Sequence, residues 1–325
     1  NLEVVPLVAR KWEISEDGRK YIFTLRRDVF FHDHSVFKNG KGRSVVADDF
    51  VYSFNRLLSE DLASSGSWVF NNVEGYYADN DSVLVINLKN PFPPFLSLLS
   101  MQYCSVVPHE LADRPEFRSQ PIGTGPFKFQ FWKEGVKLVL RKNKNYFEKE
   151  NGEKLPKLDA VAITFIKDKQ SEFLSFLQGE IDFISGIDPS YKDEILSKDG
   201  TLRDKYSEEI NLQSIPFLNT EYLAFLMDGN TVLSGNKDLR KAINYAINKK
   251  KMLKFLRNNI GVAAESGFIP KGMSSFSDSV EGYSFDKELA QKYLELAGYP
   301  NGEGLSTIVL NTTSAYLDLC EFIQS

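Results

Sequence analysis

The residues best suited to chemistry lie together in the stretch FHDHSVF, from Phe31 to Phe37. His32 and His34 are two of the three histidines in the chain, and Asp33 stands between them. Imidazole and carboxylate suit zinc, copper or iron. The two rings could share an ion only in an extended segment, where residues i and i+2 point to one face. Because this stretch supplies two such ligands at most, we expect a polar strand end here, with no metal and no other cofactor.

Other signatures of enzymes are weak or missing. The stretch GTGPF at 123–127 contains two glycines, but no Lys-Ser or Lys-Thr follows it, so it predicts a tight turn rather than a phosphate loop. His109 and Glu110 stand at the expected start of a helix after a proline, where a surface histidine is the common case. The sequence has no G-x-S-x-G elbow and no H-E-x-x-H motif. These patterns favour binding over catalysis, and a hydrolase using His32 and Asp33 stays open as an alternative.

Size and composition are typical of a globular protein of about two domains. The chain has 325 residues, of which 42% are hydrophobic. Its net charge of -5 is mild and the acidic and basic residues are interspersed, so we expect no nucleic-acid partner. The 25 Phe, 14 Tyr and 3 Trp would suit a large apolar cleft, although strand-rich folds also use many aromatic residues.

The cysteines and the chain ends give further expectations. Cys104 and Cys320 lie far apart, each in an apolar stretch, which favours buried free thiols. The sequence has no run of about 18 apolar residues, which excludes a membrane-spanning helix. It begins with NLEVVPLVARKW, without Met, and ends with YLDLCEFIQS, which looks like an unfinished helix. We therefore expect a sequence truncated at both ends.

Hydrophobic periodicity predicts a mixed α/β chain. Alternation over 20–29 predicts a strand, paired in a hairpin with the segment around Trp12. A helix is predicted over 48–59, with Asp48 and Asp49 at its positive N-terminal end. The other predicted strands are 81–88, 127–132, 136–142, 160–166, the short buried stretch GEIDFI at 179–184, 221–228 and 306–311. The other predicted helices are 170–178, ended by Gly179, then 239–253, and one that Asp286 caps and Gly298 ends.

Segments spread over nearly the whole chain resemble one family. The first two are LVARKWEISEDGRKYIFTLRRDVFFHD, similar to a strand pair, and VADDFVYSFNRLL, similar to the pattern T-A-x-D-V-x-[YF]-S-[FW]-x-R. The matching residues of the second are Ala47, Asp49, Tyr52, Ser53, Phe54 and Arg56. The later ones are IGTGPFKF, LRKNKNYF, LQGEIDFI, DLRKAINYAINKKKML and YSFDKELAQKYLELAGY. In this order they resemble the extracellular solute-binding proteins of family 5, the oligopeptide, dipeptide and nickel type that serves ABC importers.

The chain departs from the family pattern at a few positions. His34 stands where the family has a turn glycine, and the insertion SVFKNGKGRS follows it. Val46 replaces the usual helix-capping Thr, Lys144 replaces a Pro and Asn248 replaces an Asp. These changes concern local turn geometry and not the fold. At His34, either His takes the backbone conformation that Gly usually supplies, or the insertion reshapes the turn.

The resemblance implies an α/β fold with two lobes, like periplasmic binding proteins of type II with an extra subdomain, and incomplete in this chain. The extra subdomain would span residues 1–110, part of the first lobe 111–216, and the first part of the second lobe 217–325. The lobes would close over a ligand by hinge motion.

The resemblance also implies where the ligand lies, between the lobes and beside the crossing strand at 217–225. The implied lining residues are Trp68, Ser185, Gly186, Phe217, Leu218 and Asn219. For Phe217 and Leu218, ordinary core positions are an open alternative, because clefts and cores share apolar character.

By the same resemblance, the protein would be the solute-binding component of an ABC importer and not an enzyme. Its partners would be peptides or other small solutes and the permease subunits, and its membrane contact an N-terminal lipid anchor that this sequence lacks. The location would be the periplasm or the cell surface. Nickel complexes and oligosaccharides stay open as ligands, and the sensor domain of a transcriptional regulator stays open as another function.

Overall fold

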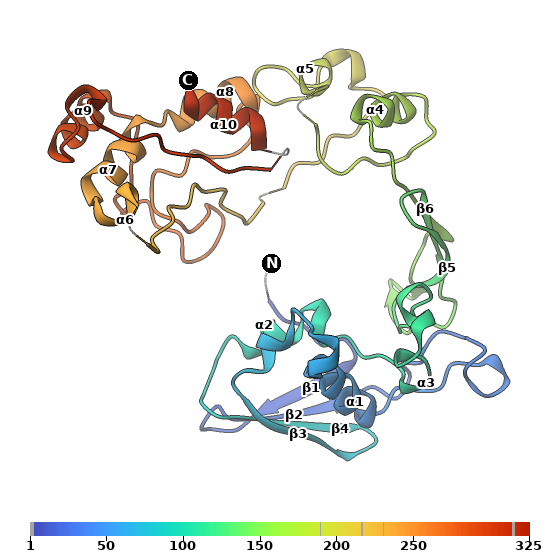
Figure 1. Cartoon of the computed structure of the whole chain (residues 1–325). Helices are drawn as coiled ribbons and strands as arrows, with labels where there is room; N and C mark the ends of the chain where they lie inside the picture. Colours follow the sequence, from blue (N-terminus) through green and yellow to red (C-terminus); the bar gives the residue numbers. More distant parts are fainter. Residues whose placement is uncertain (1–2, 189, 216, 230, 314–315) are drawn as a thin grey trace. The chain divides into compact units, whose positions relative to one another are not determined.

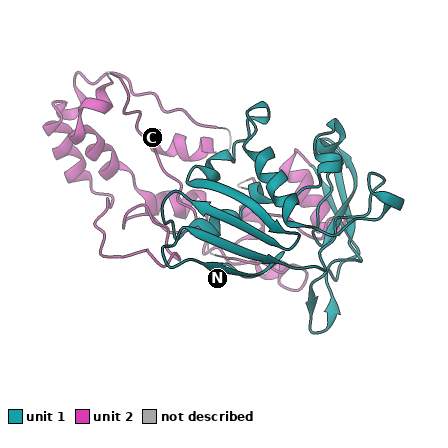
Figure 2. Ribbon diagram, turned by 90° about the horizontal axis from the view of Figure 1, so that it is seen from below, with its two compact units in different colours: residues 1–165 teal, residues 166–325 magenta. Residues whose placement is uncertain are grey.

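The computed structural model describes residues 3–188, 190–215, 217–229, 231–313 and 316–325. The chain divides into two compact units, Asn1–Phe165 and Ile166–Ser325 (Figure 2). The expected division at residues 110 and 216 stays a prediction. Within the described ranges, no helix combines the length and the apolar character needed to cross a bilayer.

Unit 1 contains a four-stranded antiparallel sheet (Figure 1). Its strands, in spatial order, are β1 (Ala9–Ile14), β2 (Lys20–Leu25), β4 (Val83–Leu88) and β3 (Val73–Asn80). Trp12 pairs with Phe23, which confirms the predicted hairpin. The edge strand β3 was not predicted, because register shifts at Val73/Gly75 and Ala78/Asn80 break the alternation on which the prediction depends.

Helix α1 (Ala47–Leu57) packs on this sheet, as predicted for 48–59. Phe54 is buried and its ring lies 4.6 Å from that of Phe70 and 5.4 Å from that of Tyr76. Tyr21 and Phe95 extend the same aromatic core, with ring centroids 5.2 Å apart. The short helical segments of unit 1 are η1 (Lys38–Gly40), η2 (Glu60–Leu62), η3 (Ser67–Phe70), α2 (Phe95–Leu99), η4 (Gln102–Cys104), α3 (His109–Ala112) and η5 (Pro115–Arg118).

A second, three-stranded antiparallel sheet follows in unit 1. It has the order β5 (Phe127–Lys133), β6 (Lys137–Lys142) and β9 (Ala160–Thr164), and all three strands were predicted. A small hairpin of β7 (Lys149–Glu150) and β8 (Glu153–Lys154) lies between β6 and β9 in the sequence. A separate buried cluster is formed by the segment after β2 and the segment between β4 and β5; it consists of Val29, Phe31, Phe37, Val45, Val106, Leu111 and Ile122.

The turn at His34 is made by the inserted residues. The left-handed positions are Asn39, at φ 56°, and Gly40, at φ 69°, whereas His34 is not left-handed. Gly42 lies so close to Phe31 that a Cβ on it would stand 1.8 Å from the Phe31 carbonyl oxygen. The Gly42 N–H donates to Asp33 Oδ1 at 3.0 Å. The position that requires glycine in this turn is therefore Gly42, near the end of the insertion, and not position 34.

The regular elements described in unit 2 are helices, joined by long irregular segments. Helix α4 (Lys169–Leu177) was predicted, and Gly179 ends it at φ 75°. The predicted helix 239–253 is two helices, α7 (Lys237–Ala246) and α8 (Lys249–Leu256), because the Asn248 side chain accepts from the Lys251 N–H and starts a new helix. Asp286 caps α9 (Lys287–Leu296), as predicted. The remaining segments are α5 (Lys192–Ile195), η6 (Asp204–Tyr206), α6 (Val232–Gly235), η7 (Pro300–Gly302) and α10 (Leu317–Gln324).

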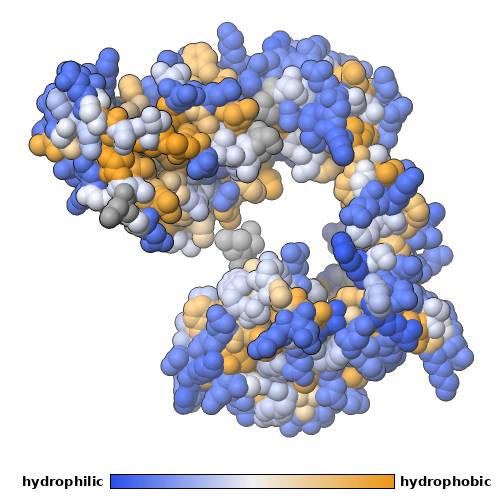
Figure 3. Space-filling model, viewed as in Figure 1, coloured by the Kyte–Doolittle hydropathy of each residue, from blue (hydrophilic) through white to orange (hydrophobic). Residues whose placement is uncertain are grey.

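The three strands predicted in unit 2, at 179–184, 221–228 and 306–311, are wrong, since the described residues there are not in strands. Alternating apolar and polar residues form a strand only where another backbone segment supplies hydrogen bonds, and no described strand pairs with these three segments. Several of their apolar side chains are exposed, with Tyr222 at 69% and Val309 at 74%. Figure 3 shows such apolar side chains on the face of unit 2 in view.

Candidate functional site

The six residues expected to line the ligand site fall in three places. Trp68 lies in η3 of unit 1, and the other five lie in two loops of unit 2. Ser185 and Gly186 belong to the loop after α4, and Phe217, Leu218 and Asn219 belong to a segment without regular secondary structure further along the chain.

Trp68 is an exposed aromatic side chain on a fixed base. The next two residues, Val69 and Phe70, are buried in the core of unit 1 at 2% and 4% exposure, whereas Trp68 is 47% exposed. Gly66, just before η3, lies against the Tyr103 ring, where a Cβ would come within 2.3 Å of the ring carbon Cγ. The core therefore holds the backbone of η3 while the indole stays accessible to a ligand.

The loop of Ser185 and Gly186 is anchored to the core of unit 2. The Gly186 carbonyl accepts a hydrogen bond from the Tyr191 hydroxyl at 3.3 Å, and Gly186 has φ 84°. Tyr191 stacks on Phe173 of α4, with ring centroids 4.6 Å apart. Ser185 itself is exposed, so the loop presents a hydroxyl and backbone groups from a fixed position.

The segment of Phe217, Leu218 and Asn219 is exposed, which excludes core positions for the two apolar residues in this structure. Phe217 is 81% exposed and Leu218 is 37% exposed. The Asn219 N–H donates to the Phe217 carbonyl at 2.7 Å, which makes a tight local turn.

A contact that the sequence did not predict holds this segment. The Thr220 hydroxyl donates to the Phe268 carbonyl at 2.8 Å, and the Tyr222 ring meets the Phe268 ring edge-on at 5.1 Å. Tyr222 and Phe268 are themselves exposed, at 69% and 62%. No local pattern could have paired Phe268 with Tyr222, because they lie far apart in the sequence.

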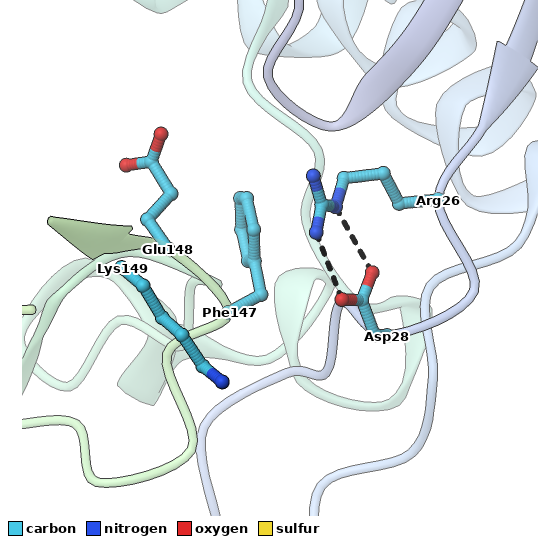
Figure 4. A pocket seen from close by; sticks show the side chains of 5 residues that line it. All are labelled: Arg26, Asp28, Phe147, Glu148 and Lys149. Atoms are coloured by element: carbon cyan, nitrogen blue, oxygen red, sulfur yellow. Dashed lines mark hydrogen bonds and ion pairs between the residues drawn. The ribbon is translucent and has the colours of Figure 1, made fainter. Parts of the chain in front are cut away.

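A cavity of about 450 Å³ lies in unit 1, and none of the six expected residues lines it. Its walls are Arg26, Asp28, Phe147, Glu148 and Lys149 (Figure 4). Arg26 binds Asp28 through two hydrogen bonds of 2.9 Å and lies 4.7 Å over the Phe147 ring. The hydrogen bond with Asp28 holds the pKa of Arg26 above its usual range. Arg26 and Asp28 are therefore both charged, and each neutralises the other.

The histidines of the opening stretch face separate backbone partners. His32 is 8% exposed, and its two ring nitrogens meet the Gly123 N–H and the Gly125 carbonyl. His34 Nδ1 accepts from the Val36 N–H at 3.3 Å. Among the described residues, no group of three or more His, Cys, Asp or Glu is placed to hold a metal ion.

Comparison with known proteins gives a family match over residues 3–325, to the family described as bacterial extracellular solute-binding proteins, family 5 Middle. The dipeptide-binding protein of Escherichia coli (strain K12) is 30% identical over 319 residues, which are 92% of this chain and 56% of that protein. Heme-binding protein A of Haemophilus influenzae is 29% identical over 320 residues, which are 92% of this chain and 55% of that protein.

Solved structures agree with these relatives. The periplasmic binding protein DppA from Helicobacter pylori, in complex with the peptide STSA, matches with a TM-score of 0.73 and 26% identity, over 92% of this chain and 58% of that one. The α/β binding-protein fold that the resemblance implied is thereby confirmed. The chain spans a little over half the length of the curated relatives it matches. A match that extends from residue 3 to residue 325, on this fold, shows that the chain belongs to the bacterial extracellular solute-binding proteins of family 5.

Proposed function

We propose that this chain is part of the solute-binding component of an ABC importer, which captures peptides between two lobes and delivers them to permease subunits in the membrane. The observation that carries the proposal is the family match over residues 3–325. The names of the Escherichia coli relative and of the Helicobacter pylori complex point to peptides as the ligand class. In this proposal the protein works outside the cytoplasm, held by an N-terminal lipid anchor, and catalyses no reaction.

The geometry of the expected lining residues fits a ligand of varied sequence. Trp68 and Phe217 present exposed aromatic faces, and the loop at Ser185 and Gly186 presents a hydroxyl and backbone groups. Backbone hydrogen bonds recognise what all peptides share, and apolar surfaces accept side chains of different shape. The known relatives named above are all binding proteins, so they give no support to a transcriptional regulator or a hydrolase.

The test uses the full-length protein that contains this chain. Its unfolding temperature is measured with a library of di- to pentapeptides, with hemin, with a nickel–histidine complex and with oligosaccharides, and co-purified ligand is identified by mass spectrometry. We expect peptides to raise the unfolding temperature, because a ligand that binds the folded state stabilises it by mass action. A protein that carries no peptide and responds to none of the library would refute the peptide proposal, whichever of the other ligands binds.

The lining residues are tested by a matched pair of variants. Phe217→Ala removes an exposed aromatic side chain of the expected site, and Phe255→Ala removes one that is 58% exposed on α8. We expect Phe217→Ala to weaken peptide binding by roughly 5- to 30-fold, or about 1–2 kcal/mol, with Phe255→Ala unchanged. If calorimetry gave equal peptide affinities for the two variants, Phe217 would not belong to the ligand site.

A further inference from the structure

His32 makes three hydrogen bonds with the loop at 123–125. The backbone N–H of His32 donates to the Gly123 carbonyl at 2.9 Å, and the backbone N–H of Gly123 donates to the ring atom Nδ1 of His32 at 3.4 Å. The other ring nitrogen, Nε2, lies 2.9 Å from the Gly125 carbonyl oxygen. A carbonyl oxygen can only accept, so Nε2 carries the hydrogen, and Nδ1, which accepts, carries none. The contacts therefore require a neutral ring in a single tautomer.

A second buried polar side chain binds the same loop, at the same carbonyl of Gly125. Asn143, at the end of β6 and 7% exposed, donates from Nδ2 to the Gly125 carbonyl at 3.0 Å. Its own N–H donates to the Pro126 carbonyl at 2.8 Å. Loop 123–126 leads directly into β5, so His32 and Asn143 together connect the segment after β2 to the three-stranded sheet. This connection consists of hydrogen bonds in a buried place, where an unmatched donor is costly.

Protonation would break this arrangement. The second proton goes to Nδ1, which then points an N–H at the N–H of Gly123, so an acceptor becomes a donor facing a donor. Burial, chiefly, lowers the pKa of His32 below its ordinary 6.5. The hydrogen bond to the Gly125 carbonyl opposes burial and raises this pKa, Lys128 of β5 lowers it, and Asp33 raises it. The Asp33 carboxylate is also bound by Gly42 and Lys41. The residue that follows β6, Asn143, also binds the Gly125 carbonyl, but it is neutral and adds no charge beside the ring.

We propose that His32 is a pH-sensitive latch: the neutral ring holds loop 123–126 against the segment after β2, and protonation at Nδ1 releases the loop. The latch is independent of which ligand the protein binds. Release loosens the sheet of β5, β6 and β9 from the rest of unit 1. A protein of an extracellular family meets the pH of its surroundings, so such a latch responds to mild acid.

The sign follows from proton linkage. The open state binds more protons than the closed state, because the pKa of His32 is lower when the latch is closed. The stability of the latch is therefore fully present above about pH 6.5, falls as the pH drops below that value, and reaches its minimum below the pKa of the closed state. Across that window one proton is linked, so loop opening rises by up to about tenfold for each pH unit.

The test is amide hydrogen exchange of the unliganded chain between pH 8 and pH 4.5, corrected for the intrinsic pH dependence of exchange. We expect the peptide that covers residues 120–128 to lose protection in acid, in the wild type and in His34→Gln and His109→Gln. His32→Gln keeps a donor for Gly125 but cannot gain a charge, so its protection should not depend on pH. The same pH dependence in His32→Gln, or a wild-type loop whose protection does not change, would overturn the latch.

A second measurement needs no variant. Nitrogen-15 chemical shifts of the wild-type histidine rings distinguish the two neutral tautomers and follow protonation. We expect the His32 ring to stay in the Nε2–H form at neutral pH and its pKa to lie below the ordinary value of 6.5. An Nδ1–H tautomer for His32, or a His32 pKa that is not lowered, would refute the geometry on which the latch depends.

Discussion

Asp49 gives the sharpest test of how unit 1 is held together. Its carboxylate is 2% exposed and accepts from the Arg43 guanidinium at 2.7 and 2.8 Å and from the Val46 N–H at 2.9 Å. Asp49→Ala removes all three bonds, each worth about 1.5 kcal/mol or more because a charge is involved. Arg43 keeps Glu110, at 2.6 and 3.0 Å, which limits the loss. We expect the free energy of unfolding of unit 1 to fall by about 3–4 kcal/mol.

Urea unfolding followed by tryptophan fluorescence measures this change in unit 1 alone. The three tryptophans of the sequence, Trp12, Trp68 and Trp132, all lie in unit 1. The control is Asp48→Ala on the same helix, where the exposed side chain has a favourable interaction with the helix dipole of about 0.5 kcal/mol. Equal midpoints for the two variants at equal slope would refute the reasoning, because burial and hydrogen bonds would then contribute nothing.

Two further predictions concern packing in unit 1. Gly42→Ala places a Cβ 1.8 Å from the Phe31 carbonyl oxygen and should cost about 2–4 kcal/mol by the same fluorescence assay, whereas Gly75→Ala, which meets open space, should change stability by less than about 0.5 kcal/mol. Burial raises the pKa of the Cys104 thiol to about 11, so a thiol reagent at pH 8 should modify the half-buried Cys320 first and Cys104 only after unfolding; equal rates in the native protein would contradict this burial.

Local patterns predicted the elements whose cause is local. The hairpin of β1 and β2, the helix α1 and the hairpin of β5 and β6 follow from alternation, helical spacing and turn residues in one short stretch. The end of α4 at Gly179 and the start of α9 at Asp286 follow from the backbone and side-chain needs of helix ends. In each case the residues that decide the structure are neighbours in the sequence.

Elements that need a distant partner were missed or wrong. The alternation at 221–228 predicted a strand, but it does not say which backbone would pair with that segment. The interactions of His32 with Gly123 and Gly125 join segments far apart in the sequence. The stretch around His32 raised the question of a metal site, and the backbone partners of its ring could not be predicted from that stretch alone. The contact between Tyr222 and Phe268 could not be predicted for the same reason.

The motifs that carried the family resemblance have a structural role in this chain. Asp49 of the helix motif binds Arg43 and the start of α1, and the glycine loop at 123–126 is held by His32 and Asn143. These residues hold the fold together, so we expect them to belong to a scaffold shared by relatives named for different ligands, dipeptide and heme. We therefore expect differences in ligand to come from exposed residues outside these two motifs. Phe217, which is exposed and belongs to the expected site, is the position where we expect a substitution to change specificity.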